Sequence, residues 1–151
     1  MEILKMLITA LLGTAGFSII FRIKPAHILP AAVGGMMTCG VYLFFDRLGC
    51  ALFLSNFLAS LAAVLYSGIL ARVLKTPSTI FVALCIIPLV PGSGLFYSMR
   101  HLIVWDRTLF FAYGPSAMQI ALGIAAGIVL ESAVVHLLGL IRRRSSGEIS
   151  V

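Results

Sequence analysis

One stretch of this 151-residue chain, Ile86–Tyr97, carries most of the residues whose types and spacing suggest chemistry. It holds two prolines, two glycines and a serine, at Pro88, Pro91, Gly92, Ser93 and Gly94. A proline has no N–H and its ring presses on the carbonyl four residues back, so the carbonyls of Leu84 and Ile87 are expected to lose their helical donors. The glycines add backbone freedom at the same place. The pattern predicts a helix that stops at the prolines and restarts after Pro91.

The first turn of a helix that restarts in this way can bind an anion. Its first N–H groups lack intrahelical acceptors and carry the positive end of the helix dipole, which favours an anionic group such as a carboxylate. Ser93 is placed to cap the new helix or to donate a hydrogen bond to a ligand. An ordinary proline kink without a ligand is the alternative, and the residues alone leave both open.

The composition places these residues in a lipid bilayer. Hydrophobic residues make up 61% of the chain and charged residues only 11%, whereas about 25% of the residues of a soluble domain are charged. Irregular backbone at membrane depth is tolerated only where protein buries it or water reaches it. The stretch with the two prolines is therefore expected to face an internal cavity.

Five apolar runs are each about long enough to cross the hydrocarbon core, which takes roughly 20 helical residues. They cover Ile3–Phe21, Ala26–Phe45, Ala51–Ala71, Ser78–Met99 and Pro115–Ile141. The predicted fold is an all-α, polytopic transmembrane helix bundle with about five spans, the fourth of them broken. Residues 1–141 form its single domain and residues 142–151 a polar cytoplasmic tail. The longest connection, Arg100–Gly114, is rich in aromatic residues and is expected to lie in the outer membrane interface.

Three other interpretations are less well supported. A signal peptide fits the first run poorly, because Glu2 offsets Lys5 and no small-residue cleavage site follows. The net charge of +6 does not predict nucleic-acid binding, since the basic residues separate apolar runs instead of sharing one amphipathic face. The chain has no catalytic motif and no cysteine spacing typical of a metal site, which predicts no enzyme, no cofactor and no metal.

The third run has two distinct faces at 100° per residue. Small and polar residues share one stripe: Asn56, Ala59, Ser60, Ala63 and Ser67. Large apolar residues share the opposite stripe: Leu54, Leu58, Leu61, Leu65 and Ile69. Because both faces lie in the membrane, the small stripe is expected to contact other helices, where Asn56 finds a partner, and the leucine stripe to contact lipid.

The fifth run repeats a four-residue spacing through Gln119, Gly123, Gly127 and Glu131. The two glycines form a GxxxG pair, which favours helix packing. A carboxylate at mid-span costs about 2.5–3.5 kcal/mol, so Glu131 is expected to face the bundle interior or water. It either couples protons or gates a substrate, or it is the structural partner of a buried polar group.

The stretch Ile87–Tyr97 resembles the P-x-x-P-G stretch of the short membrane component of the threonine/serine exporter family. Gly16-Phe17-Ser18 before a basic loop and the small-residue third run fit the same pattern, and the similarity extends over the whole chain. Of the family's pattern, only Pro88, Pro91 and Gly92 carry over to this sequence.

The resemblance implies one half of a two-component secondary exporter for threonine, serine or related small carboxylates in the bacterial inner membrane. Its partner would be a larger subunit with a hydrophilic N-terminal region. An odd number of spans agrees, because a second five-span half would enter with inverted topology. The expected substrate path comprises Pro88, Pro91, Gly92, Ser93, Gly94, Asn56 and Glu131. The alternative is a non-transporting scaffold or assembly partner whose polar stripes only bind other helices.

The distribution of lysine and arginine predicts the orientation of the five spans. One side of the membrane receives seven basic residues: Arg22, Lys24, Arg72, Lys75, Arg142, Arg143 and Arg144. The other side receives four: Lys5, Arg47, Arg100 and Arg107. Basic connections are retained in the cytoplasm, so the N-terminus is expected outside and the C-terminus inside.

Reporter proteins fused to the C-terminus test this orientation. We expect a fluorescent protein to be bright there and alkaline phosphatase to be inactive, because both would lie in the cytoplasm. Active phosphatase at the C-terminus would overturn the five-span arrangement.

Overall fold

The computed structural model describes residues 2–105 and 107–147, and for residue 131 and residues 134–147 it describes the helical backbone alone. The described part consists of six α-helices and one 3-10 turn, without a strand. These elements are α1 (Glu2–Ile20), α2 (Pro25–Arg47), α3 (Leu52–Leu74), α4 (Ser78–Ile86), η1 (Ile87–Leu89), α5 (Gly92–Ile103) and α6 (Arg107–Gly147). The prediction of an all-α, polytopic helix bundle is confirmed.

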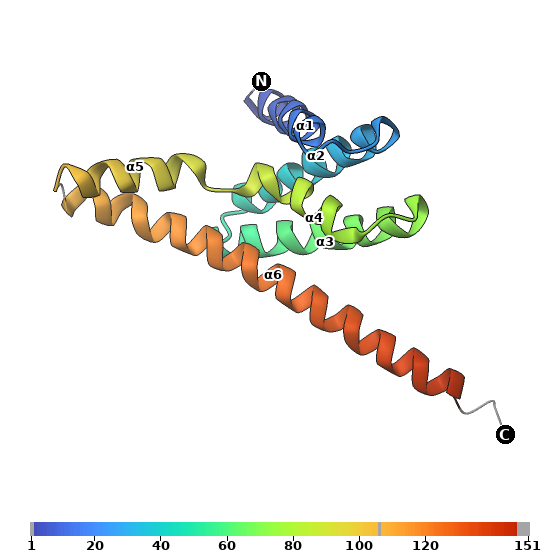
Figure 1. The fold of residues 1–151 in the computed structure, drawn as a ribbon. Helices are drawn as coiled ribbons and strands as arrows, with labels where there is room; N and C mark the ends of the chain where they lie inside the picture. The colour runs from blue at the N-terminus through green and yellow to red at the C-terminus, as the bar shows by residue number, and fades with distance from the viewer. Residues whose placement is uncertain (1, 106, 148–151) are drawn as a thin grey trace.

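Four helices, α1, α2, α3 and α6, are long and apolar enough to cross a membrane. The fourth predicted span is a bent pair, in which α5 turns by 60° away from α4 and η1. Helices α1 to α4 gather together, whereas α5 and the first part of α6 extend away from them as a hairpin (Figure 1). The fold therefore has up to five spans, with the break where the prolines predicted it.

The chain near the C-terminus is more helical than predicted. The predicted connection Arg100–Gly114 is helical over most of its length, because α5 continues to Ile103 and α6 already begins at Arg107. The turn between them is short because Trp105 adopts a left-handed conformation, with φ of 58°. Helix α6 then runs for 41 residues to Gly147, about 60 Å, so the predicted polar tail begins as helix.

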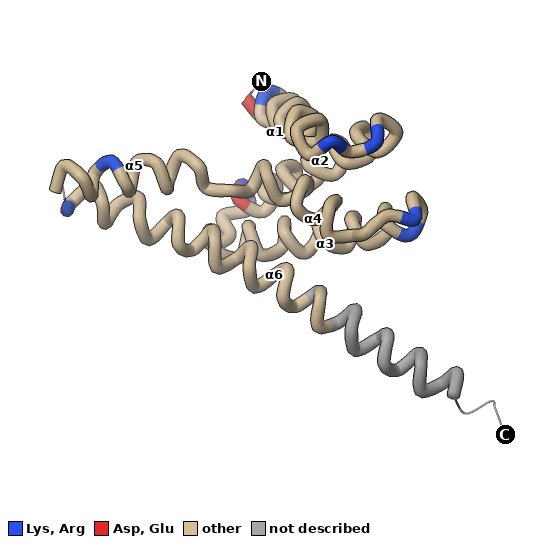
Figure 2. The backbone as a smooth tube through the Cα atoms, viewed as in Figure 1, with Lys and Arg blue, Asp and Glu red and all other residues tan. Residues whose placement is uncertain are grey.

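Left-handed residues also end the first three helices. Arg22, Gly49 and Lys75 have φ values of 52°, 77° and 50°. At the end of α1, the N–H of Ile23 donates to the carbonyl of Ser18 at 3.1 Å, the long-range bond of a Schellman motif. These tight endings allow short connections. The basic α1–α2 and α3–α4 connections lie at one end of the bundle, and the α5–α6 connection at the other (Figure 2).

Helix α2 is the centre of the bundle, in contact with α1, α3 and α4. Two consecutive glycines make this possible. A Cβ on Gly34 would lie 2.5 Å from Cys85 Sγ and 2.6 Å from Tyr66 Cε1, and a Cβ on Gly35 would overlap the side chain of Thr14. Small residues let helix backbones approach closely in a membrane. Neither position can therefore carry a side chain unless a side chain of a neighbouring helix moves.

The small stripe of α3 is buried, as predicted, and α6 covers its first part. All five of its residues are buried: Asn56, Ala59, Ser60, Ala63 and Ser67. A Cβ on Gly123 would lie 2.6 Å from the carbonyl oxygen of Phe53, and one on Gly127 would overlap the Ser60 hydroxyl. The GxxxG pair of α6 is thus the surface that packs on α3.

The opposite stripe of α3 is exposed only in part. Leu54, Leu65 and Ile69 are exposed, with 53% of Leu65 accessible, whereas Leu58 and Leu61 are half-buried. The predicted lipid-facing surface is therefore narrower than the leucine pattern suggested, because neighbouring helices cover its edges.

Buried polar side chains are satisfied within their own helices. Eight such residues are buried: Thr14, Ser18, Thr38, Ser55, Asn56, Ser60, Ser67 and Ser98. Each donates to a backbone carbonyl three or four residues earlier. Asn56 was expected to bond to another helix, but its Nδ2 donates to the carbonyl of Leu52 at 2.8 Å. A bond between helices does occur from the hydroxyl of Tyr66 to the carbonyl of Pro30, at 2.9 Å.

The packing of α3 on α6 predicts that added volume harms only one face. Gly127→Leu and Ser60→Leu should each lower the free energy of unfolding by about 1–3 kcal/mol, because the contact has no room for a larger side chain. Leu65→Ala, on the exposed face, should change it by less than about 0.5 kcal/mol. Unfolding titrations in detergent micelles measure these values, and equal losses on both faces would refute the assignment.

Candidate substrate path at the broken fourth span

The break in the fourth span is a sharp turn centred on Pro91. Helix α4 ends at Ile86 and the 3-10 turn at Leu89. Pro91 has φ of −76° and ψ of 59°, the geometry of an inverse γ-turn. The N–H of Gly92 accordingly donates to the carbonyl of Val90 at 2.7 Å. The predicted stop and restart of the helix is therefore present.

One freed carbonyl finds a different donor from the helical one. Ile87 would pair with the N–H of residue 91 in a regular helix, but residue 91 is a proline. The carbonyl of Ile87 instead accepts a hydrogen bond from the N–H of Val90, at 3.2 Å. The 3-10 turn thus provides a hydrogen bond for the carbonyl that the proline leaves without its helical donor.

The first turn of α5 carries its N–H groups toward open space. The N–H of Leu95 donates to the carbonyl of Pro91 at 2.9 Å, whereas those of Ser93 and Gly94 have no acceptor among the described residues. Ser93 is exposed and does not cap the helix, contrary to one of its two expected roles. This helix end therefore retains donors for a group from outside the chain.

The two glycines of the break have different surroundings. A Cβ on Gly94 would touch Ala117 Cβ of α6 at 3.4 Å, and the hydroxyl of Ser98 donates to the Gly94 carbonyl at 2.6 Å. No atom lies within 4 Å of a Cβ built on Gly92, and neither glycine has a positive φ. Gly94 therefore serves the packing of α5 on α6, while nothing in the described chain requires a glycine at 92.

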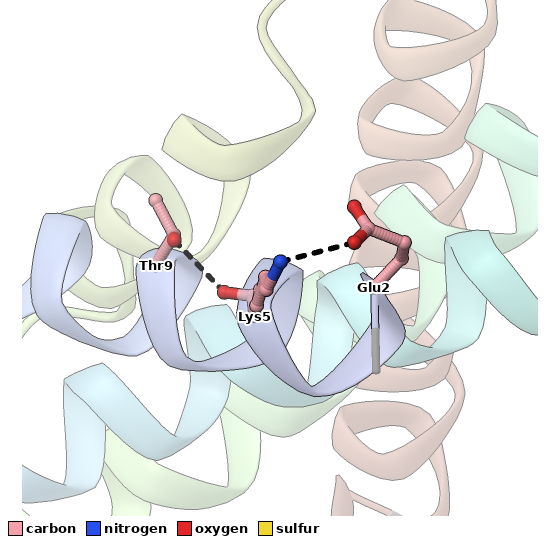
Figure 3. Close-up of polar contacts among 3 residues, drawn as sticks. All are labelled: Glu2, Lys5 and Thr9. Carbon is pink, nitrogen blue, oxygen red and sulfur yellow. Dashed lines mark hydrogen bonds and ion pairs between the residues drawn. The ribbon is translucent and has the colours of Figure 1, made fainter.

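A groove of about 340 Å³ lies between α1 and the 3-10 turn that precedes Pro91. Helix α1 forms one wall with Lys5, Thr9, Gly13 and Thr14, and Pro88 lies on the other side. The Nζ of Lys5 lies 3.1 Å from Oε1 of Glu2. Figure 3 shows the Lys5 and Thr9 side chains on the same side of α1. The volume is within the usual range for a small-molecule site.

An apolar cluster packs the 3-10 turn of the break against α3 and α6. Leu89 packs in a cluster with Ala59 of α3 and Ile124 of α6. Asn56 lies about one turn before Ala59, in the contact of α3 with α6. The break therefore lies near the small stripe of α3, but the residues of that stripe are buried in packing between helices. The side chain of Glu131 is outside the described residues.

Sequence reasoning missed the α1 wall of this groove. Lys5, Thr9 and Gly13 recur every four residues and so share one helical face. That spacing was a usable signal, but it does not reveal that the face lies opposite Pro88. Among the described residues, no group of three or more His, Cys, Asp or Glu side chains could hold a metal ion.

The two glycines should respond differently to substitution. In a chain whose native cysteines are replaced, Ser98→Cys and Gly114→Cys should cross-link α5 to α6, because a Cβ on Gly114 lies 4.0 Å from the Ser98 hydroxyl. Adding Gly94→Leu should largely abolish this disulfide, since the larger side chain pushes Ala117 away. Adding Gly92→Leu should preserve it. The yield on a non-reducing gel measures the effect, and loss with Gly92→Leu would show that position 92 is also packed.

Comparisons with known proteins support one family. Neither the search of curated proteins nor that of solved structures returned a match. The family described as "Threonine/Serine exporter, ThrE" matches residues 6–134. The match covers most of the chain and includes Thr9, Gly13 and Thr14 of the groove wall, the break and the GxxxG pair, whereas Lys5 lies just before it. Taken together with the multi-pass helical fold, it establishes that this membrane protein belongs to the threonine/serine exporter family.

Proposed function

We propose that this chain is one subunit of a secondary exporter for small amino acids, with threonine and serine or related small carboxylates as substrates. A larger membrane subunit with a hydrophilic N-terminal region completes the transporter. The complex lies in the bacterial inner membrane, with the N-terminus of this chain outside and its C-terminus in the cytoplasm. The observation that carries the proposal is the broken fourth span, because its restart leaves the N–H groups of Ser93 and Gly94 without acceptors in the described chain.

The chemistry of the break suits a substrate with a carboxylate. The N–H groups of Ser93 and Gly94 retain their donors, and they lie at the positive end of the α5 dipole. Transporters commonly place such helix ends near the bilayer midplane, facing the anionic group of the substrate. The path through this chain runs along Pro88, Pro91, Gly92, Ser93 and Gly94. Glu131 joins it in the proposal as a gating or proton-coupling carboxylate.

An open surface at the break supports the presence of a second subunit. Gly92 is the first residue of α5, and no contact within the described chain requires a glycine there. The groove along α1 is likewise a surface groove and not a closed cavity. A second subunit that covers these surfaces would convert the groove into an enclosed path.

The scaffold alternative draws its support from the small stripe of α3. Asn56 bonds to its own helix and the stripe packs on α6, so these residues serve assembly within the chain. We therefore retain Asn56 only as a neighbour of the path. The break distinguishes the two functions, since a scaffold has no need of free donors at that depth.

Two substitutions at the break test the proposal. Pro91→Ala restores an N–H that can pair with the Ile87 carbonyl, so α4 and α5 should join and withdraw the donors. Gly92→Leu should fill the open space. Each should reduce efflux of threonine or serine at least about tenfold, equivalent to about 1.4 kcal/mol. Efflux is measured from loaded cells that express this chain with its partner.

Ala125→Leu serves as the matched control, because it adds the same bulk at an exposed position of α6. It should transport at the rate of the unaltered protein. Normal efflux from both break variants at normal protein levels would mean that the break is a kink alone, even if the complex exports threonine.

A further inference from the structure

An ion pair lies at the start of α1, where one of its two residues lines the groove. Lys5 Nζ and Glu2 Oε1 lie 3.1 Å apart (Figure 3), and their side chains are 67% and 82% accessible. Exposed pairs on one helix contribute little to stability. This pair is the only salt bridge among the described side chains, and its lysine lines the groove that leads to Pro88.

The pair is complementary to the backbone of a free amino acid. Such a molecule is a zwitterion, with a carboxylate and an ammonium group on the same carbon. The Lys5 ammonium donates to a carboxylate, and the Glu2 carboxylate accepts from an ammonium. Together with the zwitterion the pair has no net charge, so binding brings no uncompensated charge to the membrane surface.

A hydroxyl group lies one turn farther along the same wall. The Thr9 hydroxyl donates its proton to the Lys5 carbonyl at 2.8 Å, which leaves its oxygen lone pairs to accept a hydrogen bond. The side-chain hydroxyl of threonine or serine can supply that proton. Lys5 and Thr9 on the wall, together with Glu2 beside Lys5 at the start of α1, thus offer partners for all three polar groups of a hydroxyl amino acid.

We propose that Glu2, Lys5 and Thr9 form a recognition site for hydroxyl amino acids at the α1 end of the groove. Glu2 and Lys5 bind the zwitterionic head, and Thr9 accepts from the side-chain hydroxyl. The inference rests on the proposed function and adds to it specificity-determining residues away from the break. When the site is empty, the two charges pair with each other. Binding therefore exchanges one ion pair for two, which keeps affinity moderate and permits release.

The test measures binding of labelled L-threonine to the purified complex with its partner subunit, in detergent. Competing analogues each lack one group: threonine methyl ester lacks the carboxylate, 3-hydroxybutyrate the ammonium and 2-aminobutyrate the hydroxyl. Lys5→Gln should weaken L-threonine binding by about tenfold, the loss expected for one charge-assisted hydrogen bond. It should also remove the preference for L-threonine over its methyl ester.

Each of the other variants should change binding of a different ligand. Glu2→Gln should remove the preference for L-threonine over 3-hydroxybutyrate, and Thr9→Val the preference over 2-aminobutyrate. Lys5→Arg, which keeps the charge, should retain most of the affinity. Lys24→Gln is the matched control, because it removes a lysine beyond the other end of α1 and should bind as the unaltered complex does.

The outcomes separate the inference from the proposed function. If Lys5→Gln and Glu2→Gln bind every analogue as the unaltered complex does, the recognition site is refuted while the exporter function stands. The recognition site is also refuted if both variants weaken all four ligands equally, since that indicates a structural effect. If the unaltered complex neither binds nor exports threonine or serine, the proposed function itself is wrong, and the recognition site falls with it.

Discussion

Close approach of helix backbones holds this protein together. Apolar side chains gain little free energy when they leave lipid to contact another helix, because lipid and the helix surface are equally apolar. Gly34 and Gly35 let α2 touch three helices, and Gly123 and Gly127 let α6 settle on α3. Each contact depends on the absence of a side chain. The bundle therefore tolerates exchanges among large apolar residues on its exposed faces far better than a single added methyl group at these glycines.

The buried polar side chains also allow the helices to pack closely. Serine, threonine and asparagine side chains within the bundle bond to carbonyls of their own helices, so they pack between helices without linking them. Helices α2, α3 and α4 also begin without a side-chain cap, and their first N–H groups lack acceptors within the helix. The start of α5 differs from them because it follows Pro91 in the middle of a broken span.

Local patterns in the sequence predicted the spans, the break at Pro91 and the buried stripe on α3, since each depends on residues close in the chain. Contacts between distant segments were not predictable in this way. Nothing in the neighbourhood of Gly34 indicates that Tyr66 and Cys85 will press against it. The position of Lys5 along the groove that ends at Pro88 likewise depends on how α1 packs. Asn56 donates to a carbonyl four residues earlier in its own helix, because the closely packed α6 leaves little room for a hydrogen bond between the two helices.

The length of α6 has a mechanical consequence. It is one continuous helix that joins the hairpin with α5 at one end, crosses α3 at Gly123 and Gly127, and continues far beyond the crossing (Figure 1). A rigid rod that pivots where it crosses a support moves its two ends in opposite directions. A tilt of the hairpin about Gly123 and Gly127 would move the distal half of α6 the opposite way only as far as α6 stays straight, and Pro115, between the hairpin and the crossing, is the position where it can bend.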